Sequence, residues 1–301
     1  PGSEYRADVG EWYDAAKKTS DIARMVSDSL VSHDSVTGTK QWSYQGGAVM
    51  NSTITIAEEI IYFVESRNAK LSQSPNSRIA PAELTSQYLV ALNSVNGEKL
   101  WEKPVDFSKC ENMLYLIHAE GTLIASGSDQ NKHYHIYAYD VSSPALRFGT
   151  ENPEIPELWR ESATGSDNDR KRFTHHGGHL QHPLVVGQTL YSDWRAFDLR
   201  SGDRKKNITV PARRGCGNMA ASNHSMFYRN HSQTMWNLDT GTTTTLQGSR
   251  TGCWLGMIPA QGLMLAPESS GGCSCDKGDI AIQTSAAWIP KASLIKSKKN
   301  R

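Results

Sequence analysis

The chain has 301 residues, with 32 Lys and Arg against 31 Asp and Glu, which gives a formal net charge of +1. Because phosphate binding needs an excess of basic side chains, this balance argues against nucleic acid as a partner. Apolar residues make up 38% of the chain, enough for a core and too many for a disordered protein. No run of 18 apolar residues occurs, so we expect no membrane-spanning helix.

The chain begins without an initiator Met or a signal peptide, so we expect either a processed protein or a fragment. Helix-forming residues over 11–27, with Ser20 or Asp21 as an N-cap, favour a short helix in a lead-in segment at 1–27. We expect the main domain at 28–290. A tail with five basic residues follows at 291–301 and is typical of a solvated terminus.

One pattern recurs along the main domain: alternating apolar residues, then Asp or Asn, then a turn with Gly, then often a Trp. It reads LVSHDSVTGTKQW from Leu30 and LVALNSVNGEKLW from Leu89. A third copy begins IYAYDVSS at Ile136, a fourth reads RAFDLRSGDRKK from Arg195, and a fifth reads MWNLDTGTTTTL from Met235. Five copies at similar spacing indicate a repeat architecture.

Each part of the pattern has a physical role. Alternation predicts a strand with one buried face, and the Asp or Asn then accepts hydrogen bonds from the turn backbone. Gly supplies the positive φ of a tight hairpin, and a Trp on the return strand packs between layers. The marker Asp or Asn falls at 34, 93, 140, 198 and 239, with spacings of 41 to 59 residues.

A further strand–turn–strand pair lies beside these hairpins, at 53–66, 113–128, 183–194, 220–230 and 256–268. Four antiparallel strands per repeat predict an all-β fold, a β-propeller of four-stranded blades. A β-sandwich is the alternative, but it does not need the same hairpin each time. About six blades are visible, with a last strand at 280–289.

The stretches STITIAEEIIYFVESR and ALNSVNGEKLW resemble the PQQ-like propeller repeat of quinoprotein-type and BamB-like proteins. HHGGHLQHPLVVGQTLY, RRGCGNMAAS and GCWLGMIPAQGLMLAPESSGGCSC are similar to a bacterial, planctomycete-type subgroup. The resemblance covers about 28–290 and implies seven or eight blades. We therefore expect one of two arrangements: a compact ring of about six blades, in which the N-terminal strands complete the last blade, or the C-terminal part of a longer ring that needs N-terminal blades to close. An open arc would expose strand edges.

Four His residues fall close together, in the segment THHGGHLQH. His179 and His182 are candidate ligands of a divalent metal, because imidazole binds Zn, Mn, Fe and Cu. One of them is alternatively a general base. A third interpretation is structural, with imidazoles bonded to blade carbonyls.

A base in this segment suggests a polysaccharide lyase acting on uronate glycans by β-elimination. His179 or His182 would take the C5 proton, Tyr191 would protonate the leaving oxygen, and Arg195 or Arg213 would neutralise the carboxylate. Further substrate contacts would come from imidazoles and from indole rings that stack on sugars, namely His175, His176, Trp194 and Trp254.

Four of the five Cys lie in the last third of the chain, at Cys216, Cys253, Cys273 and Cys275. The last two are too close to pair easily with each other, so we favour two cross-blade disulfides with the first two. Disulfides fit a periplasmic or extracellular protein. A zinc site is the alternative, although the spacing matches no zinc ribbon. Cys110 is left over and is expected to be buried.

A quinoprotein dehydrogenase would need a Ca-binding Glu, Asn and Asp set and often an adjacent Cys pair. No Cys-Cys occurs, and Glu65 and Asn68 are scattered, so we do not expect PQQ. Three functions stay open: an exported scaffold that binds a glycan or a protein, a polysaccharide lyase, and a metal-dependent site. If the protein is an enzyme, a lyase is favoured over a dehydrogenase.

Overall fold

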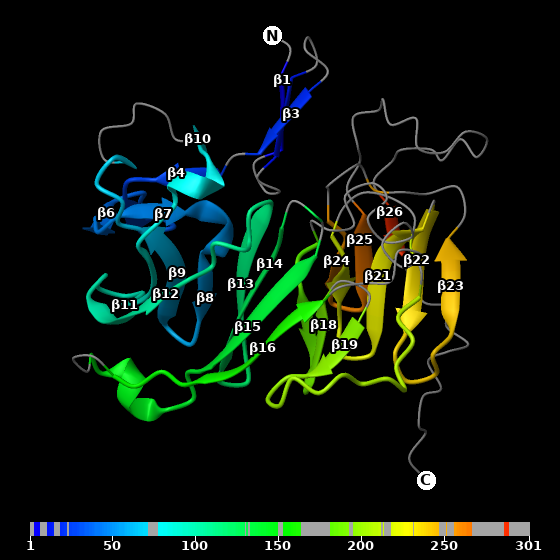
Figure 1. Cartoon of the computed structure of the whole chain (residues 1–301). Coiled ribbons are helices and arrows are strands. Elements are labelled where there is room, and N and C mark those ends of the chain that lie inside the picture. The colour runs from blue at the N-terminus through cyan, green and yellow to red at the C-terminus, as the bar shows by residue number, and fades with distance from the viewer. Residues whose placement is uncertain are drawn as a thin grey trace. The chain divides into compact units, whose positions relative to one another are not determined.

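The structure, a computed structural model, describes residues 3–6, 11–14, 19–22, 24–71, 78–129, 131, 133–149, 153–163, 181–192, 195–211, 213, 218–230, 232–246, 251, 256–266 and 286–288. Their secondary structure consists of strands and short 3-10 turns, which confirms the all-β prediction (Figure 1). Among these residues, no helix is long and apolar enough to cross a membrane. The chain divides into unit 1, residues 1–165 and 198–203, and unit 2, residues 166–197 and 204–301.

The N-terminal segment forms strands. An antiparallel sheet joins β1 (Ser3–Arg6), β2 (Glu11–Asp14) and β3 (Thr19–Ile22), and β4 (Arg24–Ser27) pairs with β7 (Ala48–Met50). The helix predicted over 11–27 is therefore wrong, because pairing with neighbouring strands overrides a weak local propensity. The proposed boundaries at 27 and 290 stay predictions.

The other sheets of unit 1 follow in chain order. A two-stranded sheet joins β5 (Leu30–His33) to β6 (Lys40–Tyr44). A seven-stranded sheet has the order β10-β4-β7-β9-β11-β12, with β8 paired to β9. Its further strands are β8 (Thr55–Ala57), β9 (Ile60–Ser66), β10 (Arg78–Ile79), β11 (Gln87–Asn93) and β12 (Lys99–Val105). A four-stranded sheet, green in Figure 1, joins β13 (Met113–Ala119), β14 (Thr122–Ser128), β15 (Tyr134–Asp140) and β16 (Glu157–Ala163).

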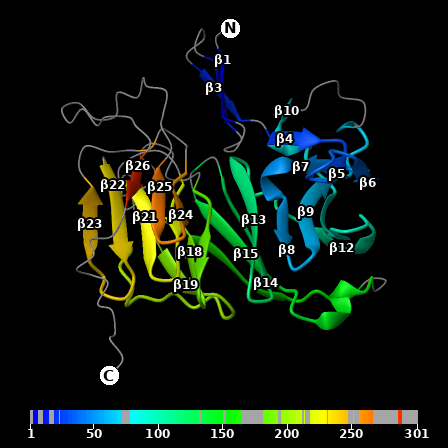
Figure 2. The same cartoon turned by 180° about the vertical axis from the view of Figure 1, so that it is seen from behind.

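Unit 2 holds three antiparallel sheets, seen from behind in Figure 2. The first joins β17 (Leu184–Val186), β18 (Thr189–Ser192) and β19 (Arg195–Asp198). The second joins β20 (Ala220–Ala221), β21 (Ser225–Asn230), β22 (Ser232–Asn237) and β23 (Thr243–Leu246), and the third joins β24 (Ile258–Ala260), β25 (Leu263–Ala266) and β26 (Ala286–Trp288). All five predicted strand–turn–strand pairs are present, one in each of five sheets, which confirms the blade-like repeat.

The predicted turn chemistry recurs at four hairpins. At Asn93, the side-chain Oδ1 accepts hydrogen bonds from the N–H groups of Val95 and Asn96, while the carbonyl accepts from Gly97. The same set of bonds occurs at Asp34, Asp198 and Asn237. The fifth marker is therefore Asn237, and the prediction of Asp239 is wrong by two positions. Asp239 instead donates its N–H to Asn237.

The Trp of one repeat docks on the hairpin of the next. Trp42 Nε1 donates to the carbonyl of Ser94 at 3.0 Å, and its ring covers Gly97. Gly97 has a φ of +75°, and a Cβ there would lie 2.6 Å from the indole Cδ2. Only glycine fits both the left-handed turn and the ring above it.

Trp159 repeats this arrangement within unit 1. Its Nε1 donates to the carbonyl of Leu199 at 3.1 Å, and its ring covers Gly202, whose φ is +76°. In both cases the carbonyl lies one residue after the Asp or Asn, and the glycine lies four residues after it. The Trp position and the hairpin are thus matched parts of one interface.

Trp101, on β12, breaks the pattern. The next hairpin in unit 1 starts at Asp140 and is opened by a long connection with a 3-10 turn at Pro144–Arg147. Trp101 is 2% exposed, and its Nε1 finds no hydrogen-bond acceptor among the described residues. The longer connection in the third repeat takes the place of the tight turn on which Trp42 and Trp159 dock.

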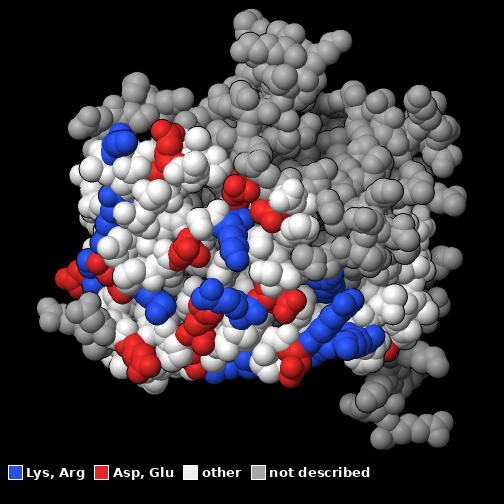
Figure 3. All heavy atoms as spheres, in the orientation of Figure 1, with Lys and Arg blue, Asp and Glu red and all other residues white. Residues whose placement is uncertain are grey.

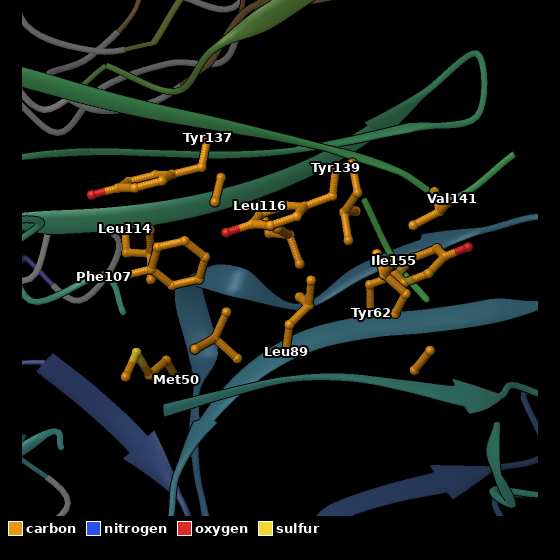
Figure 4. Close-up of a cluster of buried hydrophobic side chains, with 14 of the residues drawn as sticks. Met50, Tyr62, Leu89, Phe107, Leu114, Leu116, Tyr137, Tyr139, Val141 and Ile155 are labelled. Atoms are coloured by element: carbon orange, nitrogen blue, oxygen red, sulfur yellow. The ribbon is translucent and has the colours of Figure 1, made fainter. Parts of the chain in front are cut away.

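The core of unit 1 is continuous across its larger sheets. Phe107 packs edge-on against Tyr137 with ring centroids 4.9 Å apart, and both are buried. Tyr137 and Tyr139 point the same way from β15 in Figure 4, with Leu114 and Leu116 beside them. Alternate residues of one strand face one side of a sheet, so β15 presents both rings to the same layer.

Candidate functional site

Polar residues gather at one end of the strands in unit 2. The turns between β18 and β19 and between β21 and β22 lie at the ends of their sheets where β17 and β20 begin. This follows from antiparallel pairing, which returns alternate strand ends to one edge. The first residues of β17 and β20 lie at this same end. We call it the polar end of unit 2.

Three guanidinium groups are buried there. Arg195 begins β19, Arg229 lies near the end of β21, and Arg213 lies in the connection before β20, with exposures of 8%, 2% and 9%. Gln233 is opposite Arg229 in the β21–β22 register and is 1% exposed. Its side-chain amide has no hydrogen-bond partner among the described residues. Arginine is rarely buried to this degree, and each of these three arginines interacts with other groups of the protein, so the polar end of unit 2 is a concentration of paired basic side chains.

The charge of the two units differs in sign. Unit 2 carries 17 Lys and Arg against 7 Asp and Glu, a net charge of +10. Unit 1 carries 15 against 24, a net charge of −9. Among the described residues of unit 2, Asp239 is the one acidic side chain, and it accepts a hydrogen bond from the exposed His224 at 3.0 Å. The net charge of +1 for the whole chain hides these opposite charges of the two units. Counting the charges of each segment of the sequence separately would have shown them.

His182 is held at the polar end of unit 2. Its N–H donates to Asn218 Oδ1 at 3.0 Å, and its ring Nδ1 donates to the Pro183 carbonyl at 2.8 Å. Because a carbonyl only accepts, Nδ1 carries the proton and Nε2 is the basic nitrogen of the neutral ring. Burial lowers the pKa of His182 below its ordinary value. A neutral imidazole is the form that a general base needs.

Tyr191 has different surroundings. Its ring stands edge-on to Trp236 at 6.0 Å, in a cluster with Met219, Met226 and Tyr228. Tyr191 is 5% exposed, and burial raises the pKa of its hydroxyl. The side chain is therefore a packed core residue in this structure. The catalytic roles predicted for Tyr191 and His182 stay predictions.

Several predicted site residues lie outside the described residues: His175, His176, His179, Trp194, Trp254, Cys216, Cys253, Cys273 and Cys275. Their disulfide, metal and substrate roles stay predictions. Cys110 is buried at 4% exposure, as expected, and it is a thiol rather than half of a disulfide. Within the described residues, no group of three or more metal-ligating side chains is present.

Unit 1 contains two adjoining hollows that the sequence did not predict. One of about 270 Å³ lies between β12 and the strands β15 and β16, and a second of about 390 Å³ shares Pro104, Val105 and Asp106 with it. Basic and acidic side chains are interspersed over the described part of the face in Figure 3. The hollows depend on how side chains of distant repeats pack, so periodicity alone could not have located them.

The sequence matches the family model described as outer membrane protein assembly factor BamB over residues 15–208, more than half of the chain. No curated protein matches it. Among solved structures, BamB from Moraxella catarrhalis is 13% identical, with a TM-score of 0.47 over 81% of this chain and 62% of that chain. The chain thus spans less than two thirds of that BamB.

Two further structures are similar at lower scores. A rhamnogalacturonan lyase, YesW, is 10% identical over 81% of this chain and 52% of that chain, with a TM-score of 0.39. A europium-containing methanol dehydrogenase is 10% identical over 79% and 47%, with the same TM-score. With the repeat, its Asp and Asn turns and the family match in place, the chain belongs to the PQQ-like propeller family described as outer membrane protein assembly factor BamB.

Proposed function

We propose that the protein is an exported propeller scaffold that binds an acidic glycan at the polar end of unit 2. The observation that carries the proposal is the basic charge of unit 2, together with the burial of Arg195, Arg213 and Arg229 at one set of strand ends. The family description, an assembly factor of outer membrane proteins, supports a place in the cell envelope, and we infer a periplasmic or extracellular location.

A uronate glycan suits this chemistry better than a neutral one. Guanidinium groups bind carboxylates through two parallel hydrogen bonds, and such charged bonds are stronger than neutral ones. Their strength rises where water is excluded, as it is around side chains that are less than a tenth exposed. The polymer brings one carboxylate per residue, so it suits the net charge of +10 that unit 2 carries.

The test is a calorimetric titration of the purified chain with polygalacturonate, with neutral dextran as the comparison. Arg213→Gln keeps much of the side-chain volume and removes the charge, so we expect the Kd to rise at least about tenfold. The matched control is Arg147→Gln, an exposed arginine of unit 1 that is paired with Glu58. We expect this variant to bind like the parent chain.

Equal binding of dextran and polygalacturonate would contradict the proposal, and so would equal weakening by both substitutions. Binding to an unspecific polyanion is checked with a DNA oligonucleotide of matched charge. Because phosphate contacts release counterions, non-specific binding to it would fall steeply with salt. A site built for carboxylates should keep its preference for polygalacturonate at physiological ionic strength.

A lyase is the second candidate, and the neutral state of His182 favours it. In this proposal His182 or His179 removes the C5 proton, with Tyr191 as the acid and Arg195 or Arg213 as the carboxylate partner. Incubation with polygalacturonate would release unsaturated oligomers, and His182→Ala would abolish them. A folded chain that binds the polymer and leaves it uncut would restrict the function to the scaffold.

A further inference from the structure

A hydroxyl, an imidazole and a carboxylate form a continuous chain of hydrogen bonds on the sheet β13–β16 of unit 1. Ser162 on β16 lies opposite His135 on β15 in the strand register, and its Oγ is 3.0 Å from His135 Nδ1. His135 Nε2 is 3.3 Å from Asp129 Oδ2. Ser162 is exposed, whereas His135 is 7% exposed, so the imidazole lies behind the hydroxyl.

The Asp129 carboxylate determines which atoms donate and which accept in this row of hydrogen bonds. A carboxylate can only accept, so His135 donates from Nε2 to Asp129, and in the neutral ring its Nδ1 is then the acceptor for the Ser162 hydroxyl. Burial alone would raise the pKa of Asp129, but the His133 N–H and the His135 ring hold it below the usual range. The backbone N–H of His133 donates to Asp129 Oδ1 at 2.9 Å and orients the carboxylate.

The hydroxyl opens onto a cavity. Ser162 lines the hollow of about 270 Å³, whose walls include Lys103, Lys109 and Tyr137. Attack on an ester makes its carbonyl oxygen negative, and the hollow carries three cationic side chains, Lys103, Lys109 and Arg160. The hollow also carries Asp106, Glu157 and Glu161, so its three acidic and three basic side chains balance. This lining suits a polar, uncharged ligand of small size.

We propose that Ser162, His135 and Asp129 form a second site, which hydrolyses short-chain carboxylic esters of polar alcohols. Ser162 Oγ bonds to the carbonyl carbon while its proton passes to His135 Nδ1. The ester C–O bond then breaks, and His135 returns the proton to the leaving alkoxide. Water next adds to the acyl-serine with His135 as the base, which releases the carboxylic acid and restores the hydroxyl. This proposal does not depend on glycan binding by unit 2.

The test uses the full chain with a fluorophosphonate serine probe, and then with p-nitrophenyl acetate. We expect one probe per chain, attached to Ser162, and no labelling of Ser162→Ala. His135→Gln, which cannot accept the proton as a base, should slow labelling and ester hydrolysis at least about tenfold. Ser43→Ala is the matched control, since Ser43 is an exposed serine on the outer strand β6, and it should react like the parent chain.

Absence of labelling in the folded parent chain would overturn the proposal, as would labelling at another residue. Equal rates for His135→Gln and the parent chain would also overturn it, because the hydroxyl would then react without the imidazole. Circular dichroism melts of the three variants separate loss of reaction from loss of fold. Ser162→Ala removes an exposed hydroxyl and should melt like the parent chain.

Discussion

The two units use the same repeat and carry opposite charge. In unit 1, acidic side chains are paired with arginines: Arg67 bonds Glu65 and Glu102, and Arg200 bonds Asp140. In the described part of unit 2, buried arginines stand at one set of strand ends with one acidic residue, Asp239, elsewhere. The comparison teaches that the turn and strand pattern determines the fold, while the remaining positions are left to determine what each unit binds.

The largest difference between the units should appear at the turn glycines. Gly97 of unit 1 lies beneath Trp42, whereas Gly241 of unit 2 has a φ of +71° and open space around it. Gly97→Ala adds a clash to the left-handed strain, so we expect a loss of about 3 kcal/mol in unfolding free energy. Gly241→Ala carries the strain alone and should lose about 1 kcal/mol. Urea denaturation measures both values.

An equal loss of unfolding free energy in the two alanine variants would show that the Trp42 ring moves aside at little cost. The docking of Trp on the hairpin would then contribute little to stability. A serine in place of each glycine makes a useful companion series. Its side chain is only slightly larger than that of alanine, so the ranking should be unchanged.

Acid should act on unit 1 through Glu102. Arg67 donates to both oxygens of Glu102 at 2.9 and 2.7 Å and, with Lys99, holds its pKa at about 2. The folded pKa lies below the unfolded value, so the stabilisation is complete above about pH 4.5 and is lost as the pH falls towards 2. Glu102→Gln should lower the unfolding free energy by about 2 kcal/mol at pH 7, and it should weaken the further loss of stability between about pH 4.5 and 2. Hydrogen exchange of β9 and β12 amides reports it.

A parent chain whose unit 1 amides stay protected down to pH 2 would contradict this account of the ion pair. Lys99→Gln is the control, since Lys99 is more exposed than Arg67 and bonds one oxygen of Glu102. We expect it to change the loss of stability at low pH less than Glu102→Gln does.

A smaller titration with the same sign, at a higher pH, should mark unit 2. Burial lowers the pKa of His182, so the unfolded chain takes up the proton first as the pH falls through about 6.5. Unit 2 should therefore lose stability at a higher pH than unit 1, and His182→Gln should remove that slope. Exchange of β17 and β18 amides between pH 7 and 5.5 tests it. Identical slopes in the parent chain and the variant would refute the assignment.

Much of the fold could be read from the sequence because the turn chemistry is local. Asn93 and the glycine four residues later determine a hairpin by themselves, and the same bonds form at three of the five predicted markers, Asp34, Asn93 and Asp198. It failed over 11–27, where helix-forming residues pair as strands, and at Asp239, where Asn237 two positions earlier is the acceptor.

The site was harder to predict, since it depends on contacts between distant residues. Ser162 and His135 are separated by 27 positions and meet only through the β15–β16 register. Arg195 and Arg213 were singled out in the sequence, and the structure places both at the polar end of unit 2 with high burial. Arg229 was missed, because an arginine within an apolar strand gives no local signal of a site.

The unsatisfied indole of Trp101 has a consequence for how unit 1 comes apart. Docked tryptophans couple each repeat to the next, so the chain behaves like a row of elements with nearest-neighbour coupling. At Trp42 and Trp159 that coupling includes a hydrogen bond, whereas the indole N–H of Trp101 finds no acceptor in the part of the chain that the structure describes. The junction between β12 and the sheet β13–β16 is therefore the weak link in the row. When unit 1 is unfolded by force, β12 and the sheet β13–β16 should separate first at this junction. During refolding, this junction should form last.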